Sequence, residues 1–306
     1  MRKKLNILLV LIPFLAVGLQ SCSKWNSAEP IEQHFIYPWE KDPATWEKYF
    51  GLLNDYKAQE HTIVYAAFDN GNDKGDGELN YMRSLPDSLD IVSLTDADHF
   101  SKADREDMEW MHRTGTKVLY HVDYAARRAE SPDEAALSAY LDKVCATVSA
   151  EGLDGFSFTG FPDYSGEDPM AAKAADLLVS RLDVEGKLLV FEGNPKFIKE
   201  ADRAKVDYFV LATRTKEFEA DVKFMISDAR ALGVKDTQLI LSADMKGKMT
   251  TSSLEEARQL DKITAMTVSQ GPVAGIALYG IADDYYHSDS NYVEVRETIQ
   301  KLNPSK

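Results

Sequence analysis

Eight short apolar runs recur between residues 63 and 279, and amphipathic stretches separate them. The runs are almost continuously apolar, which is typical of parallel strands that are buried on both faces. The stretches between them carry apolar residues at helical spacing, so the chain alternates strand with helix. The expected strands cover residues 63–68, 90–94, 117–122, 153–159, 188–191, 207–211, 238–242 and 275–279.

Strands that alternate with helices form either a closed barrel or an open doubly wound sheet. The chain has no glycine-rich phosphate-binding turn after its first strand, which disfavours an open nucleotide-binding sheet. We therefore expect an α/β fold, a (β/α)8 barrel of TIM type, as a single domain over residues 40–306. In this fold, functional residues lie at the carboxyl ends of the strands.

Capping signals predict where several helices begin. The helix that follows residue 131 carries Cys145 on its apolar face, so we expect a buried structural thiol there. Gly152 is expected to end that helix. The expected helix starts are residues 131–134, Ser101 with Asp104, residues 253–256, and Asp42-Pro43.

The first 22 residues have the pattern of an export signal. Three basic residues precede an apolar run over residues 5–19, which is short for a membrane span and typical of a signal peptide. The run closes with Leu19-Gln20-Ser21-Cys22, which resembles the lipobox of bacterial lipoproteins. The resemblance implies a signal peptide over residues 1–21 and lipidation of Cys22. We expect a polar tether over residues 22–39 and anchoring at the outer membrane and cell surface of a Gram-negative bacterium.

The charge of the chain excludes some partners. The chain has 35 basic and 50 acidic residues, and loss of residues 1–21 takes the formal net charge from −15 to −18. That charge opposes binding to nucleic acid. The acidic stretch over residues 69–77 lacks the glutamate that closes a calcium-binding EF-hand loop. We therefore expect neither a metal nor a cofactor.

The fourth expected strand carries the most informative motif, Leu153-Asp154-Gly155-Phe156-Ser157-Phe158-Thr159-Gly160-Phe161. Because side chains alternate along a strand, its phenylalanines at 156 and 158 are expected to face the helices. Ser157 and Thr159 would then face the barrel interior, and Phe161 would reach the mouth.

At this strand the chain resembles glycoside hydrolase family 18, which comprises chitinases and endo-β-N-acetylglucosaminidases. The family pattern is Asp-Gly-x-Asp-x-Asp-x-Glu, and this chain shares Asp154 and Gly155 with it. Supporting similarities lie at residues 90–94, 206–210 and 278–304. The last of these resembles a lipoprotein branch of the family from glycan-foraging Gram-negative bacteria.

This chain differs from the family pattern at the positions of the catalytic residues. Ser157 and Thr159 stand where the family has its second and third aspartates, and Phe161 stands where it has the catalytic glutamate. In the family, that glutamate protonates the leaving oxygen, while the substrate's own N-acetyl group attacks. Phenylalanine has no proton to give, and general acid catalysis contributes on the order of 10²–10⁴-fold. The resemblance therefore implies a catalytically degenerate barrel, for which Asp163 is the fallback acid.

A barrel without that acid could still bind a sugar, because aromatic faces and planar polar groups are expected at its rim. Phe161 and Tyr279 are the strongest of these candidates. The candidate ligand-binding residues are Phe68, Asp69, His121, Tyr124, Phe161, Tyr164, Glu192, Asn194, Arg214, Asp244 and Tyr279.

Three functions remain open from the sequence. The first is a surface glycan-binding lipoprotein, whose ligands by family analogy are N-acetylglucosamine-containing glycans such as N-glycans. The second is an active endo-β-N-acetylglucosaminidase with a relocated acid. The third is a structural partner of an outer-membrane glycan uptake complex.

Overall fold

Eight parallel strands close into a barrel in the computed structural model, which describes residues 38–71 and 77–304. The strands follow one another around the barrel in chain order, and β10 closes it by pairing with β1. The predicted (β/α)8 fold is thus confirmed, and every predicted strand lies within two residues of an observed one. The barrel strands are β1 (Ile63–Phe68), β2 (Ile91–Leu94), β3 (Lys117–Val122), β4 (Gly155–Gly160), β5 (Leu188–Gly193), β6 (Tyr208–Leu211), β7 (Leu239–Asp244) and β10 (Gly275–Tyr279).

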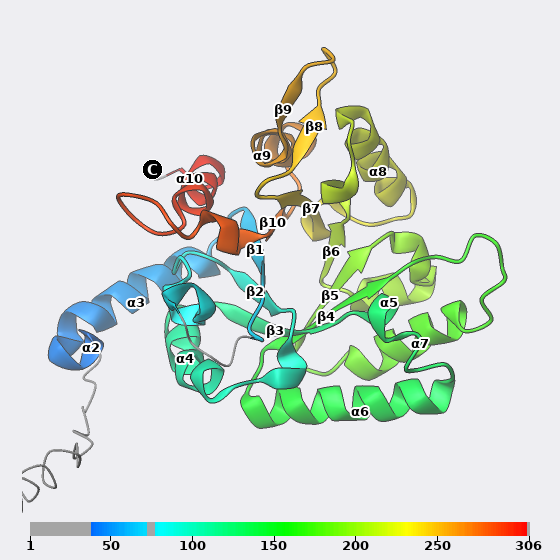
Figure 1. The fold of residues 1–306 in the computed structure, drawn as a ribbon, viewed down its shortest axis with the longest axis horizontal. Helices are drawn as coiled ribbons and strands as arrows, with labels where there is room; N and C mark the ends of the chain where they lie inside the picture. The colour runs from blue at the N-terminus through cyan, green and yellow to red at the C-terminus, as the bar shows by residue number, and fades with distance from the viewer. Residues whose placement is uncertain (1–37, 72–76, 305–306) are drawn as a thin grey trace, which may run out of the picture. The chain divides into compact units, whose positions relative to one another are not determined.

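Helices connect the strands, and α6 and α7 lie side by side next to β4 (Figure 1). The barrel and its helices belong to one compact unit that begins at Lys48. The α-helices are α2 (Pro38–Lys41), α3 (Pro43–Ala58), α4 (Lys102–Arg113), α5 (Tyr124–Arg127), α6 (Glu134–Glu151), α7 (Ala171–Leu182), α8 (Glu219–Ala231), α9 (Gln259–Ser269) and α10 (Val293–Leu302). Short 3₁₀ segments are η1 (Glu78–Asn80), η2 (Met82–Ser84), η3 (Ala97–His99), η4 (Pro195–Phe197), η5 (Glu200–Lys205), η6 (Thr213–Thr215), η7 (Asp236–Gln238) and η8 (Ile281–Asp284).

The core has two parts, because the two faces of each strand pack differently. The larger part lies between strands and helices and includes Phe156 and Phe158, as the alternation in β4 predicts. The smaller part fills the barrel with one residue from most strands. Ser157 is fully buried and hydrogen-bonds to Ser93 on β2 and to His121 on β3. The inner members are Tyr65, Ile91, Leu119, Val190, Val210, Ile240 and Ala277.

The amino-terminal end of the barrel is held by aspartates that precede strands. Asp90 accepts a hydrogen bond from the Val64 amide at 2.8 Å, and Asp207 accepts one from the Leu189 amide at 2.8 Å. Asp154 accepts one from the Val118 amide at 3.0 Å and lies near Lys117 and His112. These contacts outweigh the effect of burial and lower the pKa of Asp154. Each aspartate thus fixes the start of its strand against the preceding one.

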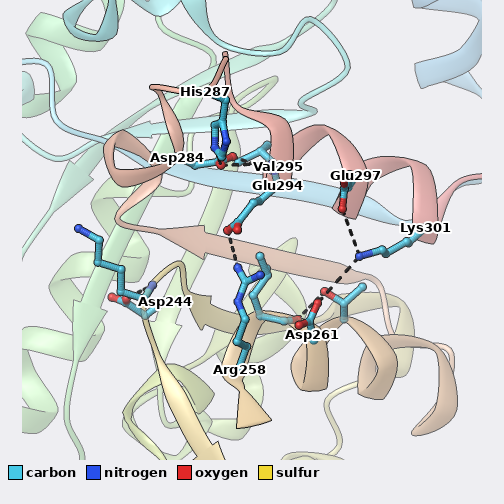
Figure 2. A network of polar contacts seen from close by, with 12 residues as sticks. Asp244, Arg258, Asp261, Asp284, His287, Glu294, Val295, Glu297 and Lys301 are labelled. Carbon is cyan, nitrogen blue, oxygen red and sulfur yellow. Dashed lines mark hydrogen bonds and ion pairs between the residues drawn. The ribbon is translucent and has the colours of Figure 1, made fainter. Parts of the chain in front are cut away.

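Helix α10 is anchored through Asp284, as Figure 2 shows. The Asp284 carboxylate accepts hydrogen bonds from the amides of Glu294 and Val295, and His287 lies 2.6 Å from it. A carboxylate at the amino-terminal end of a helix satisfies amides that have no partner within the helix.

Three of the predicted helix ends agree with the structure. Ser101 caps α4 in a capping box with Asp104. Asp42 accepts a hydrogen bond from the Thr45 amide at the start of α3, and Gly152 ends α6 in a left-handed conformation.

Two predicted helix starts are wrong. The cap of α6 is Asp133 rather than Ser131, because the Asp133 carboxylate accepts a hydrogen bond from the Ala136 amide at 2.8 Å. Residues 253–256 do not open a helix. They form the turn and outgoing strand of a hairpin, β8 (Lys248–Thr250) with β9 (Glu256–Arg258), and α9 begins only at Gln259. Leu254 has φ +63 in this turn, which no helical residue adopts.

Cys145 is half-buried rather than fully buried. Its sulfur lies 3.5 Å from the Arg181 carbonyl oxygen, and desolvation raises the pKa of the thiol. The thiol at this position is therefore mostly protonated near neutral pH.

The predicted signal peptide, Cys22 and most of the tether lie outside the described residues. Within residues 38–71 and 77–304, no helix has the length and apolar character that a membrane span requires. The same residues contain no group of three His, Cys, Asp or Glu side chains placed to hold a metal.

Candidate functional site

Glu192 lies at the centre of the barrel's carboxyl end, which we call the mouth. The alternation that buries Leu188 and Val190 in the barrel also turns Glu192 inward, and its side chain is only 9% exposed. Tyr65 and Tyr279 donate hydrogen bonds to its two oxygens at 2.5 and 2.6 Å. His121 Nδ1 lies 3.4 Å from Glu192 Oε1.

These contacts hold Glu192 as an anion. Burial alone would raise its pKa, but the charge of His121 and the hydrogen bonds from His121, Tyr279 and Tyr65 outweigh burial and lower the pKa to about 2. For His121, burial disfavours the charged form, yet the negative charge of Glu192 raises the pKa of the imidazole overall. The two side chains therefore stabilise each other's charged forms, and Glu192 has no proton to donate near neutral pH.

Two serines extend this network across the barrel. Ser157 Oγ lies 2.8 Å from His121 Nδ1 and 2.7 Å from Ser93 Oγ. Both serines are fully buried, so these hydroxyls satisfy one another and the imidazole. Ser157 thus contributes a neutral hydroxyl to the network.

Thr159 also faces the interior, and its hydroxyl donates a hydrogen bond to Asp123 at 3.0 Å. Asp123 in turn caps α5 by accepting a hydrogen bond from the Ala126 amide. Thr159 therefore orients a neighbouring carboxylate and carries no charge of its own.

Aromatic side chains stand exposed just beyond β4. Phe161 is 65% exposed and Tyr164 is 73% exposed. The Tyr164 hydroxyl accepts a hydrogen bond from Asn194 at 2.9 Å, and Lys196 Nζ lies 5.7 Å from the centre of its ring. Tyr164 is thus held in one orientation while its ring remains open to solvent.

Asp163, the fallback acid, is engaged in its own loop. Its carboxylate accepts hydrogen bonds from the Ser165 hydroxyl at 2.6 Å, the Asp168 amide at 2.6 Å and the Ser165 amide at 3.0 Å. The bonds from Ser165 and Asp168 lower its pKa. A carboxylate stabilised as an anion is a poor proton donor.

The remaining charged candidates surround the mouth at other strand ends. Arg214 follows β6, and its guanidinium lies 4.2 Å from the centre of the Tyr279 ring. Asp244 ends β7 and accepts a hydrogen bond from the Lys246 amide (Figure 2). Asp69 follows β1 and accepts one from the Gly71 amide.

Two sequence candidates do not reach the mouth. Phe68 is 3% exposed and shares with Val64 and Ala66 the face of β1 that packs under the helices. Tyr124 is 4% exposed and packs against Phe197 at a ring distance of 6.2 Å. Both side chains belong to the outer core, so the expectation that they contact a ligand is corrected.

Tyr65 and Ser93 are site residues that the sequence analysis missed. Side-chain alternation along β1 could have identified Tyr65, because a strand that turns Phe68 toward the helices turns Tyr65 toward the barrel interior. Tyr65 and Ser93 lie within strands, and the structure places both in the polar network around Glu192 and Ser157.

The motif residues that this chain retains lie at the opposite end of β4. Asp154 holds the start of the strand, as described above. Gly155 lies so close to β5 that an added Cβ would meet the Leu188 carbonyl oxygen at 2.1 Å. Asp154 and Gly155 therefore have a structural role, and Ser157 and Thr159 lie nearer the mouth.

Comparison with known proteins identifies the family of the chain. The sequence model of glycoside hydrolase family 18, BT1044-like, matches residues 29–301. The chain belongs to this family. The predicted family resemblance is thereby confirmed. No curated protein sequence matches the chain.

Solved structures of family 18 proteins share the fold. A selenomethionine form of BT1044 aligns with a TM-score of 0.69 at 20% identity, covering 87% of this chain and 95% of that one. An endo-β-N-acetylglucosaminidase from Cordyceps militaris aligns with a TM-score of 0.65 at 19% identity, covering 83% and 95%. A chitinase from Bacteroides thetaiotaomicron aligns with a TM-score of 0.61 at 11% identity, covering 79% and 97%. At these identities the likeness concerns the fold.

Proposed function

We propose that this family 18 chain is a glycan-binding lipoprotein of the cell surface that does not hydrolyse its ligand. The observation that carries the proposal is the side chain at the family's acid position. Phe161 stands there, 65% exposed, with no group that can protonate a glycosidic oxygen. Losing that proton donor removes on the order of 10²–10⁴-fold in rate by itself.

The nearby carboxylates do not favour the alternative of a relocated acid. Glu192 is held as an anion with a pKa of about 2, and hydrogen bonds from its loop lower the pKa of Asp163. A general acid for a glycosidase needs a raised pKa, because it must be protonated before the reaction begins. The pKa values of Glu192 and Asp163 are both lowered instead.

The ligand class follows from the fold relatives and the exposed aromatic rings. One similar structure is that of an endo-β-N-acetylglucosaminidase, which supports N-acetylglucosamine-containing glycans such as N-glycans as ligands. Tyr164 offers a fixed, exposed ring, and such rings stack on the apolar faces of sugars.

Glycan binding can be tested on a glycan array with the full chain and the variant Tyr164→Ala. Loss of the ring should weaken binding about tenfold, since one aromatic contact is worth roughly 0.5–1.5 kcal/mol beyond its buried area. Phe224→Ala is the matched control, because Phe224 is 71% exposed on α8. No binding by the unmodified chain, or equal losses in both variants, would refute the proposal.

A further inference from the structure

Arg214 differs from the other described arginines in the polar partners of its guanidinium group. Most of them pair with a carboxylate, as Arg105 does with Glu151. Arg203 and Arg296 have no carboxylate partner but donate to backbone or side-chain oxygens. Within residues 38–71 and 77–304, Arg214 is the arginine whose guanidinium makes no hydrogen bond or ion pair, and it lies over the Tyr279 ring.

The position of Arg214 is nevertheless fixed. Its amide donates a hydrogen bond to Ser242 Oγ at 3.0 Å, and its carbonyl oxygen accepts one from Gln259 Nε2 at 3.0 Å. The Tyr279 ring beneath the guanidinium is itself held by its hydrogen bond to Glu192. A cation that is oriented before binding loses little conformational freedom when a ligand arrives.

The carboxylates at the neighbouring strand ends form no ion pair with Arg214. Glu192 is balanced by His121 and by two tyrosine hydroxyls. Asp244 accepts the Lys246 amide and forms no ion pair with the guanidinium, and Lys246 pairs with Asp283. In a chain with 35 basic and 50 acidic residues, an arginine left open at the mouth is therefore available to a ligand.

We propose that the glycan bound at the mouth carries an anionic substituent, and that the Arg214 guanidinium binds it. This inference rests on the proposed glycan-binding function. The substituent is a carboxylate, as on a sialic or uronic acid, or a sulfate ester. Both groups present at least two anionic oxygens that the guanidinium fork can bind with two hydrogen bonds. Because Arg214 covers a face of Tyr279, a ligand that approaches this face meets the cation first.

The test compares glycans in matched pairs by calorimetric titration of the full chain in detergent. One pair is a sialylated biantennary N-glycan and its desialylated form, which tests a carboxylate. The other pair is N-acetylglucosamine 6-sulfate and N-acetylglucosamine, which tests a sulfate. In at least one pair, we expect the anionic member to bind at least about tenfold more tightly than the neutral member. Hydrogen bonds between charged groups have contributions of this size.

Arg214→Gln should bring the affinity ratio of that pair to about one, while Arg214→Lys, which keeps the charge, should retain part of the preference. Arg181→Gln is the matched control, because Arg181 is an exposed arginine on α7 that pairs with Asp142. It should leave the ratio unchanged.

The outcomes separate this inference from the proposed function. Equal binding of charged and neutral members, or a preference that survives Arg214→Gln, would overturn the inference and leave glycan binding intact. If no member of either pair binds and no glycan on the array binds, both proposals fail together.

Discussion

Glu192 illustrates how single residues determine what this barrel can do. Its carboxylate is surrounded by donors from three strands, so its charge is stabilised although its side chain is nearly buried. Burial of a carboxylate without such partners would raise its pKa and make it a candidate acid. Here the hydrogen bonds and the nearby imidazole lower the pKa more than burial raises it. Glu192 therefore acts as a fixed anion that orients His121, Tyr65 and Tyr279.

Replacing Glu192 with Gln should alter the titration of His121. Without the negative charge, burial becomes the main influence, and the pKa of His121 should fall below its value in the unmodified chain. NMR titration of the imidazole resonances measures this. Glu185→Gln, at an exposed glutamate, should leave the His121 pKa unchanged. An unaltered His121 titration in Glu192→Gln would contradict the ion pair.

The same substitution should change the acid stability of the protein. The pKa of Glu192 is lowered from 4.5 to about 2 on folding, so its stabilising contribution is present above pH 4.5 and is lost as the pH falls towards 2. The advantage of the unmodified chain over Glu192→Gln should therefore shrink, by an amount on the order of 3 kcal/mol over that range. Urea unfolding at several pH values between 5 and 3 tests this, and a constant difference would contradict it.

At the scale of elements, the sequence predicted the barrel strands well because each is buried on both faces and almost uniformly apolar. It failed at the β8–β9 hairpin, where residues 253–256 carry helix-start signals. Long-range backbone pairing determines the structure of that region. Strand β8 also bridges to Phe218, and the Thr250 amide donates a hydrogen bond to the Glu217 carbonyl oxygen. Such long-range pairing leaves no local signal in the sequence.

At the mouth, too, some side-chain positions were predictable from the sequence and others were not. Strand alternation correctly predicted that Ser157 and Thr159 face inward. Phe68 and Tyr124 were placed at the mouth by their position after strands, without regard to which face they share. The network around Glu192 could not be predicted, because it joins side chains from β1, β3, β5 and β10, and its hydrogen-bonded partners lie 87 and 127 residues away from Glu192 in the chain.

Gly155 tests the close approach of β4 to β5. In Gly155→Ala the new Cβ would meet the Leu188 backbone at 2.1 Å, and a backbone atom cannot rotate aside. We expect a loss of about 1–3 kcal/mol in the free energy of unfolding, the usual cost of overpacking. Gly51→Ala on α3 is the control, because open space surrounds Gly51 and alanine should stabilise the helix by up to about 1 kcal/mol. Equal effects in denaturant unfolding would refute this account.

For the whole molecule, the proposal joins a family 18 barrel to a lipid anchor at Cys22. In this proposal the mouth lacks the acidic residues of the family motif, and the anchor would keep that mouth at the cell surface. A strongly acidic chain with a lipid anchor is expected to meet sugars and uptake components rather than nucleic acid.

Anchoring can be tested by Cys22→Ala in cells that carry out lipoprotein processing. Loss of the acyl chains should move the protein from the membrane fraction to the soluble fraction, because each buried CH₂ group contributes about 0.8 kcal/mol. Ser23→Ala, at the adjacent residue, is the control and should remain in the membrane fraction. Unchanged fractionation of Cys22→Ala would contradict the lipobox interpretation.

The central claim is that this barrel binds glycans without cutting them. Native mass spectrometry of the full chain incubated with an N-glycopeptide tests it most directly, because one spectrum reports both the complex and any cleavage products. We predict a complex whose mass equals that of the protein plus the intact glycopeptide, even after long incubation. Released glycan that persists through repeated purification would contradict the claim.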